Sequence, residues 1–310
     1  MKNKSKPIVV VGSSNVDLTM KMERLPRVGE SVTDAQFMQT YGGKGANQAV
    51  GAARAGGNVY FVNCVGDDDF TVPMLENYQN DGINIDYVFK EEGTASGTAL
   101  IMAGEGGDNY LSVAPGANYK LTPDHIDQTG NLIEDAGVII LQYEILAETI
   151  KHVIDQAYAK NTPVLWNFAP ARDFDFSYLK KINTLVVNES EAEFITGNKI
   201  ESIDDARVAA CNILEKGLKN VIITLGKTGS YLFNENEEIV MPAFNVKAVD
   251  TTAAGDVFCG AFAVSIVEGK PFKEALRFAT AASAISVCQM GAQPSAPYRE
   301  EIKKFLEENG

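Results

Sequence analysis

The feature that most constrains the fold is a regular alternation of short, apolar, β-branched runs with longer helical segments. We expect strands at residues 8–11, 61–66, 138–141, 164–167, 184–188 and 221–225. We expect helices at residues 46–55, 72–81, 147–160, 189–196, 203–216, 257–267, 273–289 and 299–308. Apolar strands separated by helices form parallel sheets that are covered on both faces. The chain is therefore predicted to be an α/β protein with a parallel central sheet.

Three segments break this pattern. Residues 18–23 and 98–113 alternate apolar and polar side chains, and the second contains a Gly-Gly-Asp turn. Such alternation is typical of half-exposed antiparallel strands, so the two could pair as a small sheet outside the main domain. An isolated small sheet exposes an apolar face, so we expect it to cover an active site, a second subunit or both. Residues 230–243 predict a β-hairpin.

Composition limits the function classes. The 310 residues are 45% apolar, which suffices for one large domain or one domain with an appendage. The net charge of −14 with no basic block argues against a nucleic-acid partner but leaves a nucleotide open. The apolar run after the N-terminus stops at Val11, so we expect no signal peptide or membrane span and a cytoplasmic location. The scattered cysteines predict buried thiols, with neither disulfides nor zinc: Cys64, Cys211, Cys259 and Cys288.

The segment 249–262, VDTTAAGDVFCGAF, carries the strongest chemical signal. Ala254 and Gly255 stand where an apolar helix should begin, and small residues there allow a ligand close to the backbone. The first turn of a helix has unpaired N–H groups and favours a phosphate. Asp256 in that turn could take a proton from a nucleophile that attacks the phosphate, or it could cap the helix. These residues alone leave both interpretations open.

Polar residues that could bind a ligand also lie in two other places: directly after the first strand, and within the glycine-rich segment 41–49. Asn15 and Asp17 come directly after 8–11, at the sheet edge where ligands bind, and an amide beside a carboxylate suits sugar hydroxyls. An Asx turn is the alternative for either residue. Gly43 allows a tight turn or close ligand approach, and Asn47 would lie one helical turn further on. The spacing is not that of a Walker A loop.

Other strand ends carry polar residues too. Glu144 follows the strand at 138–141, Asn188 ends another with Glu191 in the next turn, and residues 224–229 look fit to hold a nucleotide. Each could be a cap or a turn. Their shared position at the carboxyl edge of the sheet favours a site.

Two motifs, GGKGANQA at 42–49 and DTTAAGDVF at 250–258, bring these features together. With NVD at 15–17, PGAN at 115–118, NESE at 188–191 and GAQPS at 291–295, the chain resembles the ribokinase branch of the pfkB-type carbohydrate kinases over nearly its whole length. The second motif more often has glycine where Ala253 stands.

The resemblance implies a ribokinase-like three-layer α/β/α fold with a mostly parallel central sheet. It implies one kinase domain over 1–310, with a β lid from about 15–41 and 96–114 that pairs two copies as a homodimer. The implied reaction transfers the γ-phosphate of ATP to the 5-hydroxyl of D-ribose, with Asp256 as the base and the N–H groups of Ala254, Gly255 and Asp256 as the anion hole. The implied sugar contacts are Asn15, Asp17, Gly43, Lys44, Asn47, Glu144 and Asp256.

The resemblance also implies nucleotide and cation positions. The nucleotide should lie among Asn188, Thr224, Gly226, Lys227, Gly229, Gly255 and Thr280. Glu191 should place Mg²⁺ through water. A potassium ion, the expected monovalent activator, should lie among the Asp250 carboxylate, the carbonyls of Thr252, Ser286, Gln289 and Gly291, and Ser295. Carbonyl-rich cages suit a large cation of low charge.

Alternatives remain at this stage. The substrate could be deoxyribose, fructose or a nucleoside, since one sequence does not separate them. A non-catalytic sugar-binding protein on the same fold is a different class, against which the intact Asp256 and its loop argue. A dinucleotide-dependent oxidoreductase is disfavoured because residues 12–15, GSSN, lack GxGxxG.

Overall fold

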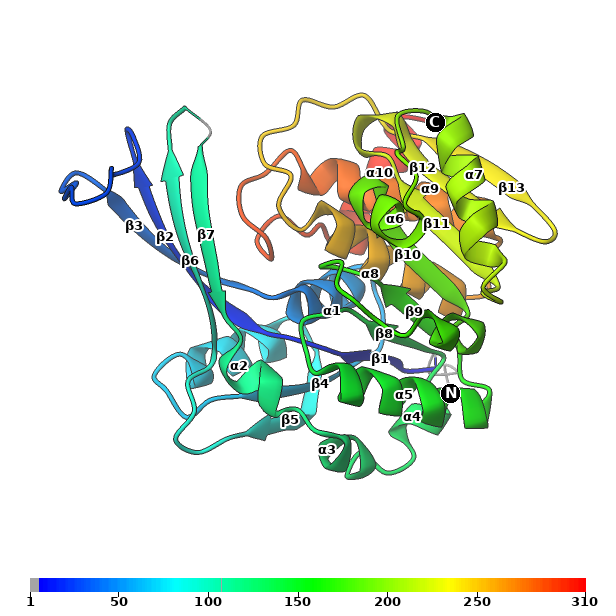
Figure 1. Cartoon of the computed structure of the whole chain (residues 1–310), viewed down its shortest axis with the longest axis horizontal. Coiled ribbons are helices and arrows are strands. Elements are labelled where there is room, and N and C mark those ends of the chain that lie inside the picture. The colour runs from blue at the N-terminus through cyan, green and yellow to red at the C-terminus, as the bar shows by residue number, and fades with distance from the viewer. Residues whose placement is uncertain (1–5, 107) are drawn as a thin grey trace.

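A computed structural model describes residues 6–106 and 108–310 of the chain. Its main sheet has the strand order β13-β12-β11-β10-β9-β8-β1-β4-β5 (Figure 1). The strands are β1 Ile8–Val11, β4 Val59–Val65, β5 Asn84–Lys90, β8 Val138–Leu141, β9 Val164–Asn167, β10 Thr184–Asn188, β11 Asn220–Thr224, β12 Gly229–Asn234 and β13 Glu238–Pro242. The strands from β5 to β11 pair in parallel, whereas β12 and β13 form an antiparallel hairpin at one edge. The mostly parallel sheet and the hairpin are thus confirmed.

Helices cover both faces of this sheet, which gives the three-layer arrangement. One layer is α1 Lys44–Arg54, α2 Thr71–Asn80, α8 Ala254–Val267, α9 Phe272–Ser286 and α10 Arg299–Glu308. The other is α3 Pro123–Asp127, α4 Leu132–Asp135, α5 Ala147–Lys160, α6 Glu189–Thr196 and α7 Ile203–Leu214. Short 3₁₀ helices lie at η1 Gly116–Lys120, η2 Phe176–Lys181 and η3 Gly226–Thr228.

The β1 strand shows why its sequence is uniformly apolar. Ile8 and Val10 enter the core on the α8 side, whereas Val9 and Val11 enter the core on the α5 side. Successive side chains of a strand point to opposite faces, so a strand between two helical layers has no polar face.

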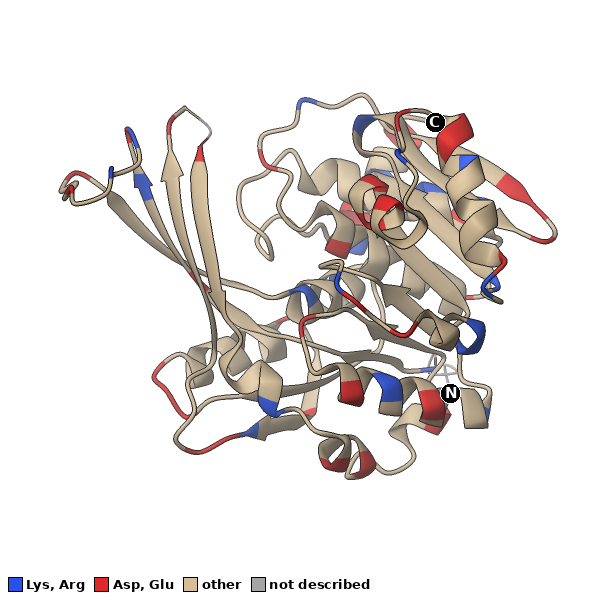
Figure 2. Cartoon of the chain, in the orientation of Figure 1, with Lys and Arg blue, Asp and Glu red and all other residues tan. Residues whose placement is uncertain are grey.

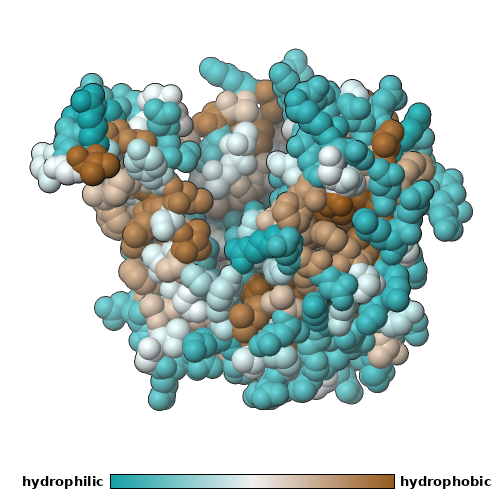
Figure 3. All heavy atoms as spheres, viewed as in Figure 1, coloured by the Kyte–Doolittle hydropathy of each residue, from teal (hydrophilic) through white to brown (hydrophobic). Residues whose placement is uncertain are grey.

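A second, four-stranded sheet projects from the body (Figure 1). It comprises β2 Asn15–Met22, β3 Gln36–Gly42, β6 Gly97–Gly104 and β7 Asn109–Ala114, in the order β3-β2-β6-β7. The expected pairing of the two alternating segments is confirmed, since β2 pairs with β6. Each segment also has the expected antiparallel partner, β3 for β2 and β7 for β6, whereas β2 and β6 themselves run in parallel. A chain that leaves the main sheet twice in the same direction delivers two parallel strands. The space-filling view shows a hollow between this sheet and the body (Figure 3).

Other expectations need correction. The strands β3 and β5 were not predicted, and α1 begins at Lys44 rather than at residue 46. Cys64 and Cys259 are buried free thiols, but Cys288 is exposed and Cys211 only half-buried, so burial does not hold for all four. Among the helices of the described chain, none is long and apolar enough to cross a bilayer.

Candidate active site

The loop after β1 lies against the start of α1. Gly43, the residue before α1, has φ 87°, and a Cβ there would stand 2.8 Å from the Asn15 nitrogen. A Cβ on Gly45 would stand 2.5 Å from the Ser13 nitrogen. The two glycines therefore let the helix N-terminus meet the loop that leads into β2.

Glu144 joins these two segments from the end of β8. Its Oε2 accepts hydrogen bonds from Ser13 Oγ at 2.6 Å and from the Lys44 N–H at 2.9 Å. A carboxylate at a helix N-terminus is favoured by the helix dipole.

Asn15 and Asp17 lie on one face of β2, as their spacing predicts. Asn15 is buried, and its Oδ1 accepts from Asn118 Nδ2 at 2.9 Å. Asn118 Oδ1 also accepts from the Ser14 N–H at 2.9 Å. The side chain of Asn118 therefore fixes this loop, and the Asn15 side chain is engaged with Asn118 instead of forming an Asx turn. Burial, together with the Glu144 charge, raises the pKa of Asp17 to about 7.

Asp256 lies in the first turn of α8 but does not cap the helix. The residue before α8 is Ala253, at φ 58°, and no side chain there makes a capping hydrogen bond. Asp256 instead reaches α1, where Oδ2 accepts from Asn47 Nδ2 at 3.1 Å and Oδ1 from Gln48 Nε2 at 2.9 Å. The geometry therefore removes the capping interpretation for this buried carboxylate.

The pKa of the Asp256 carboxyl group is raised overall. Burial raises the pKa of its carboxyl group, while the Lys44 charge and the amides of Gln48 and Asn47 oppose that rise. Asp256 in turn raises the pKa of Lys44. Asn47 Oδ1 is buried and has no hydrogen-bond partner within the described residues. An unpaired buried acceptor beside a carboxylate is a position that a ligand hydroxyl can fill.

The space in front of the α8 turn is open. A Cβ on Gly255 would meet no atom within 4 Å, and Gly255 is exposed while Asp256 beside it is buried. The N–H groups of a first helical turn have no intrahelical partner. The turn thus has both the room and the donors for an anion.

The carboxyl ends of β10 and β11 carry the expected nucleotide residues. Asn188 and Thr224 pair directly across these strands. Asn188 and Glu191 form a capping box, with Glu191 N donating to Asn188 Oδ1 at 2.9 Å and Asn188 N donating to Glu191 Oε2 at 2.8 Å. The capping interpretation is therefore correct for this pair. Glu191 is also buried, and its pKa is raised by burial, with the Lys44 and Asp256 charges within reach.

The segment after β11 is a tight glycine turn. Gly226 has φ 49° with open space on its Cβ side, and Gly229 has φ 118° with Met241 O only 2.0 Å from where a Cβ would be. Lys227 lies between them in η3. Thr280, in α9, is buried with an Oγ1 that has no partner in the described chain.

Asp250 meets the loop after α9. Its Oδ1 accepts from Thr252 N at 2.9 Å and Thr252 Oγ1 at 2.6 Å, and its Oδ2 accepts from Gly291 N at 2.9 Å. Burial alone would raise the pKa of Asp250, but the bonds from Thr252 and Gly291 outweigh it and lower the pKa. The buried hydroxyls of Ser286 and Ser295 pair at 2.8 Å, and Gln289 N donates to the Ser286 carbonyl. The structure thus gathers the residues expected around potassium.

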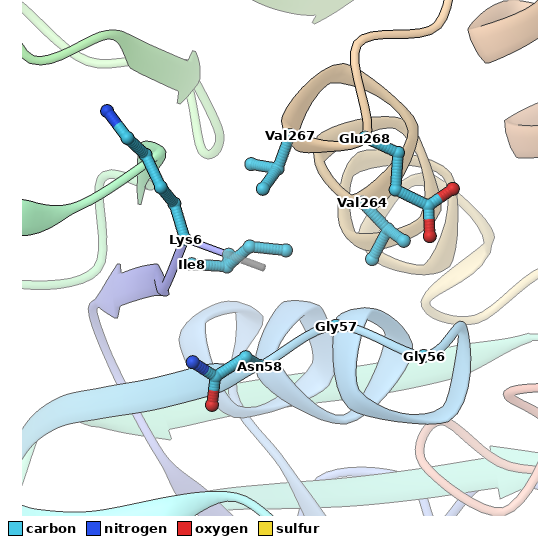
Figure 4. A pocket seen from close by; sticks show the side chains of 8 residues that line it. All are labelled: Lys6, Ile8, Gly56, Gly57, Asn58, Val264, Val267 and Glu268. Carbon is cyan, nitrogen blue, oxygen red and sulfur yellow. The ribbon is translucent and has the colours of Figure 1, made fainter. Parts of the chain in front are cut away.

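Two clefts lie at the opposite, amino edge of the main sheet. One holds about 10 Å³ between Ile8, Gly57 and Val264, with Val264 and Val267 turned toward Ile8 (Figure 4). The other, about 210 Å³, lies where β8 to β11 begin, against Phe262 and Phe272. Neither contains a predicted site residue. In the view of Figure 2, acidic and basic residues are intermixed along the described chain.

Comparison with known proteins decides the family. Residues 5–299 match the model described as "pfkB family carbohydrate kinase". The chain belongs to the pfkB family of carbohydrate kinases. It is 38% identical over 303 residues to a deoxyribokinase of Salmonella typhi, covering 97% of this chain and 99% of that protein. It is 38% identical over 299 residues to a ribokinase of Bacillus subtilis, with 96% and 99% covered.

A solved structure supports the same placement. The Arabidopsis thaliana ribokinase complexed with ribose and ATP superposes with a TM-score of 0.93 at 34% identity, covering 98% of this chain and 99% of that one. The ribokinase-like fold is confirmed, and the chain is a sugar kinase of this family.

Several residues of this pfkB-family site were not singled out from the sequence. Ser13 and Asn118 fix the loop around Asn15, and Gln48, Gln142 and Asn167 form a buried amide chain that reaches Asp256. Gln48 lies inside the GGKGANQA motif, next to Asn47, and that position was the available signal.

Proposed function

We propose that this chain is a ribokinase that transfers the γ-phosphate of ATP to the 5-hydroxyl of D-ribose. The observation that carries the proposal is the placement of Asp256: a buried carboxylate at the open amino end of α8, turned toward Asn47 and away from its own helix. A helix cap needs no such arrangement, whereas a base that faces a phosphate does.

The sugar would lie between β2, α1 and Glu144. Asp17 and Glu144 offer carboxylate oxygens as hydrogen-bond acceptors, and the unpaired amide oxygen Asn47 Oδ1 is a further acceptor. Asn15 would contact the sugar from a position that Asn118 fixes. The Lys44 side chain and the Gly43 backbone, at the start of α1, would complete the contacts. Preset acceptors of this kind hold a polyol in one orientation.

Asp256 would accept the proton of the attacking hydroxyl. The N–H groups of Ala254, Gly255 and Asp256 would stabilise the negative charge on the transferred phosphoryl group, which enters the space left open at Gly255. The left-handed conformation of Ala253 turns the backbone so that this helix begins at Ala254. The nucleotide would lie along the glycine turn of η3, near Thr224, Lys227 and Gly229, with Asn188 beside it and Thr280 Oγ1 as a buried polar contact.

The donor sets fit the two expected cations. Glu191 uses Oε2 in its capping box, and its Oε1, which makes no hydrogen bond within residues 6–106 and 108–310, could accept from water on Mg²⁺. Bound Mg²⁺ would neutralise phosphate charge. Asp250 and the carbonyls of Thr252, Ser286, Gln289 and Gly291, with Ser295, would hold K⁺ and thereby fix the turn that precedes α8.

The small sheet would act as a lid and as the dimer surface. Met20, Phe37, Met102 and Tyr110 are cross-strand neighbours in register and share one face of this sheet, and all four are exposed. We expect two copies to bury this face. Mass measurement by light scattering should give a dimer for the parent and a monomer for Met102→Glu, and a monomeric parent would contradict the expectation.

Deoxyribose is the second candidate substrate, because the Salmonella typhi relative is a deoxyribokinase. The two sugars differ by one hydroxyl, and a site that hydrogen-bonds this group leaves a buried polar atom unpaired when it is missing. The ratio of kcat/KM for the two sugars therefore assigns the substrate.

The experiment is an ADP-release assay over ribose, 2-deoxyribose, fructose and nucleosides. We expect ribose to give the highest kcat/KM, by at least ~10-fold over deoxyribose, from one unsatisfied hydrogen bond. A ratio below one would assign a deoxyribokinase. Sugar binding without turnover of any of these compounds would favour the non-catalytic binding protein.

A further inference from the structure

A chain of buried amides runs from the main sheet to Asp256. Asn167, at the end of β9, donates its Nδ2 to the Val186 carbonyl at 3.2 Å. Gln48 Nε2 donates to Asn167 Oδ1 at 3.0 Å and to Asp256 Oδ1 at 2.9 Å. Gln142 Nε2 donates to Gln48 Oε1 at 2.7 Å. Relative exposures of 0% for Gln48, 1% for Gln142 and 8% for Asn167 exclude water from most of this chain.

The backbone sets the direction of these hydrogen bonds. The Val186 carbonyl can only accept, so Asn167 must turn its NH₂ group toward it and its oxygen toward Gln48. Gln48 must then present its NH₂ group on that side. A side-chain amide has two N–H donors, and the second points at Asp256 Oδ1.

Gln142 closes the arrangement from the other side. With both N–H groups in use, Gln48 directs its oxygen toward Gln142, which supplies the donor. A Cβ on Gly12 would stand 2.0 Å from Gln142 Oε1, so the glycine makes room for this side chain. A flipped Gln48 would place its oxygen against the Asp256 carboxylate and against Asn167 Oδ1, and both contacts are repulsive.

We infer that Gln48 is a positioning residue, held in one amide orientation by Asn167 and Gln142, which fixes the Asp256 carboxylate as the proton acceptor. The inference rests on the proposed function for the identity of the reaction. Gln48 touches neither sugar nor nucleotide in this arrangement, because its polar atoms are all engaged within the amide chain and with Asp256. Its loss should therefore act on the chemical step.

The sign of the pH effect follows from the groups around Asp256. Lys44 from α1 favours its ionised form, whereas Glu144 after β8, Glu191 from α6 and the Cys259 thiol of α8 would oppose it when charged. An amide donor also favours the ionised carboxylate. Removal of Gln48 should therefore raise the pKa of Asp256, and the acidic limb of the kcat profile should move to higher pH.

The test compares Gln48→Met with Gln142→Met and with both changes together, since methionine keeps the length of the side chain without its amide. We expect Gln48→Met to lower kcat at least ~10-fold with the sugar KM within about 3-fold, and to move the acidic limb up by about one pH unit. Gln142→Met should also lower kcat and move the acidic limb to higher pH, but by smaller amounts than Gln48→Met. The double variant should be no worse than Gln48→Met, because Gln142 acts through Gln48.

Thr149→Val is the matched control. Thr149 is buried in α5 and donates its hydroxyl to the Leu121 carbonyl at 2.6 Å, and neither residue belongs to the amide chain. It should lower thermal stability without moving the pH profile. A parental kcat in Gln48→Met, or a fall that follows thermal stability with an unshifted acidic limb, would overturn the inference.

A second readout separates this inference from the proposed function. The carboxyl signal of Asp256 in ¹³C-aspartate-labelled protein, identified by its absence in Asp256→Asn, can be titrated without substrate. It should titrate about one pH unit higher in Gln48→Met. If no sugar is turned over, the proposed function fails and this titration alone decides the role of Gln48. An unshifted signal would contradict it.

Discussion

Asp17 gives the most quantitative prediction, because the same carboxylate should serve binding and oppose folding. Its pKa is raised from an ordinary value of 3.8 to about 7, by burial and by the Glu144 charge. The folded protein therefore holds this proton more tightly than the unfolded chain does. Ionised Asp17 costs folding free energy, and the cost begins above the unfolded pKa, grows between pH ~4 and ~7 and is complete above that.

The perturbation is Asp17→Asn, which keeps the shape and removes the charge. A shift of about three units corresponds to at most ~4 kcal/mol at ~1.36 kcal/mol per unit. The advantage of the variant over the parent in the free energy of unfolding should be ~1–2 kcal/mol at pH 5 and grow by roughly 2–3 kcal/mol by pH 8. Its sugar KM should rise roughly 10- to 100-fold, since a charge-assisted acceptor is lost, with the ATP KM unchanged.

Urea unfolding at pH 5 and pH 8, with ADP-release kinetics at pH 8, measures both effects. Asp155→Asn is the control, since Asp155 is an exposed partner of Lys181, and it should change neither the pH dependence nor the sugar KM. A variant that is equally or less stable than the parent at pH 8 would refute the reasoning about burial. Equal rises in the sugar and ATP KM would point to a folding or lid defect.

Three further predictions concern the turn before and within α8. Gly255→Ala should raise the free energy of unfolding by ~0.5–1 kcal/mol, because its Cβ meets no atom, but should lower kcat in the ADP-release assay by filling the space proposed for the phosphate; a parental kcat would place the phosphate elsewhere. Ala253→Gly should keep activity and unfold no more easily than the parent in urea, since glycine relieves a left-handed conformation at φ 58° that costs ~1 kcal/mol; a loss above that amount would contradict this. K⁺ should activate over Na⁺ at constant ionic strength, and Asp250→Ala, which releases Gly291, should abolish the response; a flat response in cation-stripped parent enzyme would refute the potassium site.

The central sheet could be predicted because its strands lack any polar face. A uniformly apolar strand such as Ile8–Val11 must bury both of its faces, and a position between two helical layers provides this. The missed strands have a different character: Gln36–Gly42 is largely exposed, and Asn84–Lys90 lies half-buried at a sheet edge. Neither has the continuous apolar pattern that identifies a buried strand.

The residues of the candidate site that lie in recognisable motifs could be predicted from the sequence. The buried amides that hold Asp256 in place could not. Asp256 and Asn47 were found by motif, yet 209 positions separate them, and only the fold shows that they are hydrogen-bonded. Gln48, Gln142 and Asn167 are polar residues in buried segments, and the local sequence does not indicate which residues they hydrogen-bond. Their meaning depends on hydrogen bonds across four elements, which no local pattern contains.

The most direct test of the account is the turnover of Asp256→Asn. The variant keeps an oxygen and an NH₂ group in place of the two carboxylate oxygens, but it no longer accepts a proton from the sugar. We predict that kcat falls by ~10²- to 10⁴-fold, while calorimetry gives parental Kd values for sugar and nucleotide. A kcat within a few-fold of the parent would contradict the assignment of Asp256 as the base.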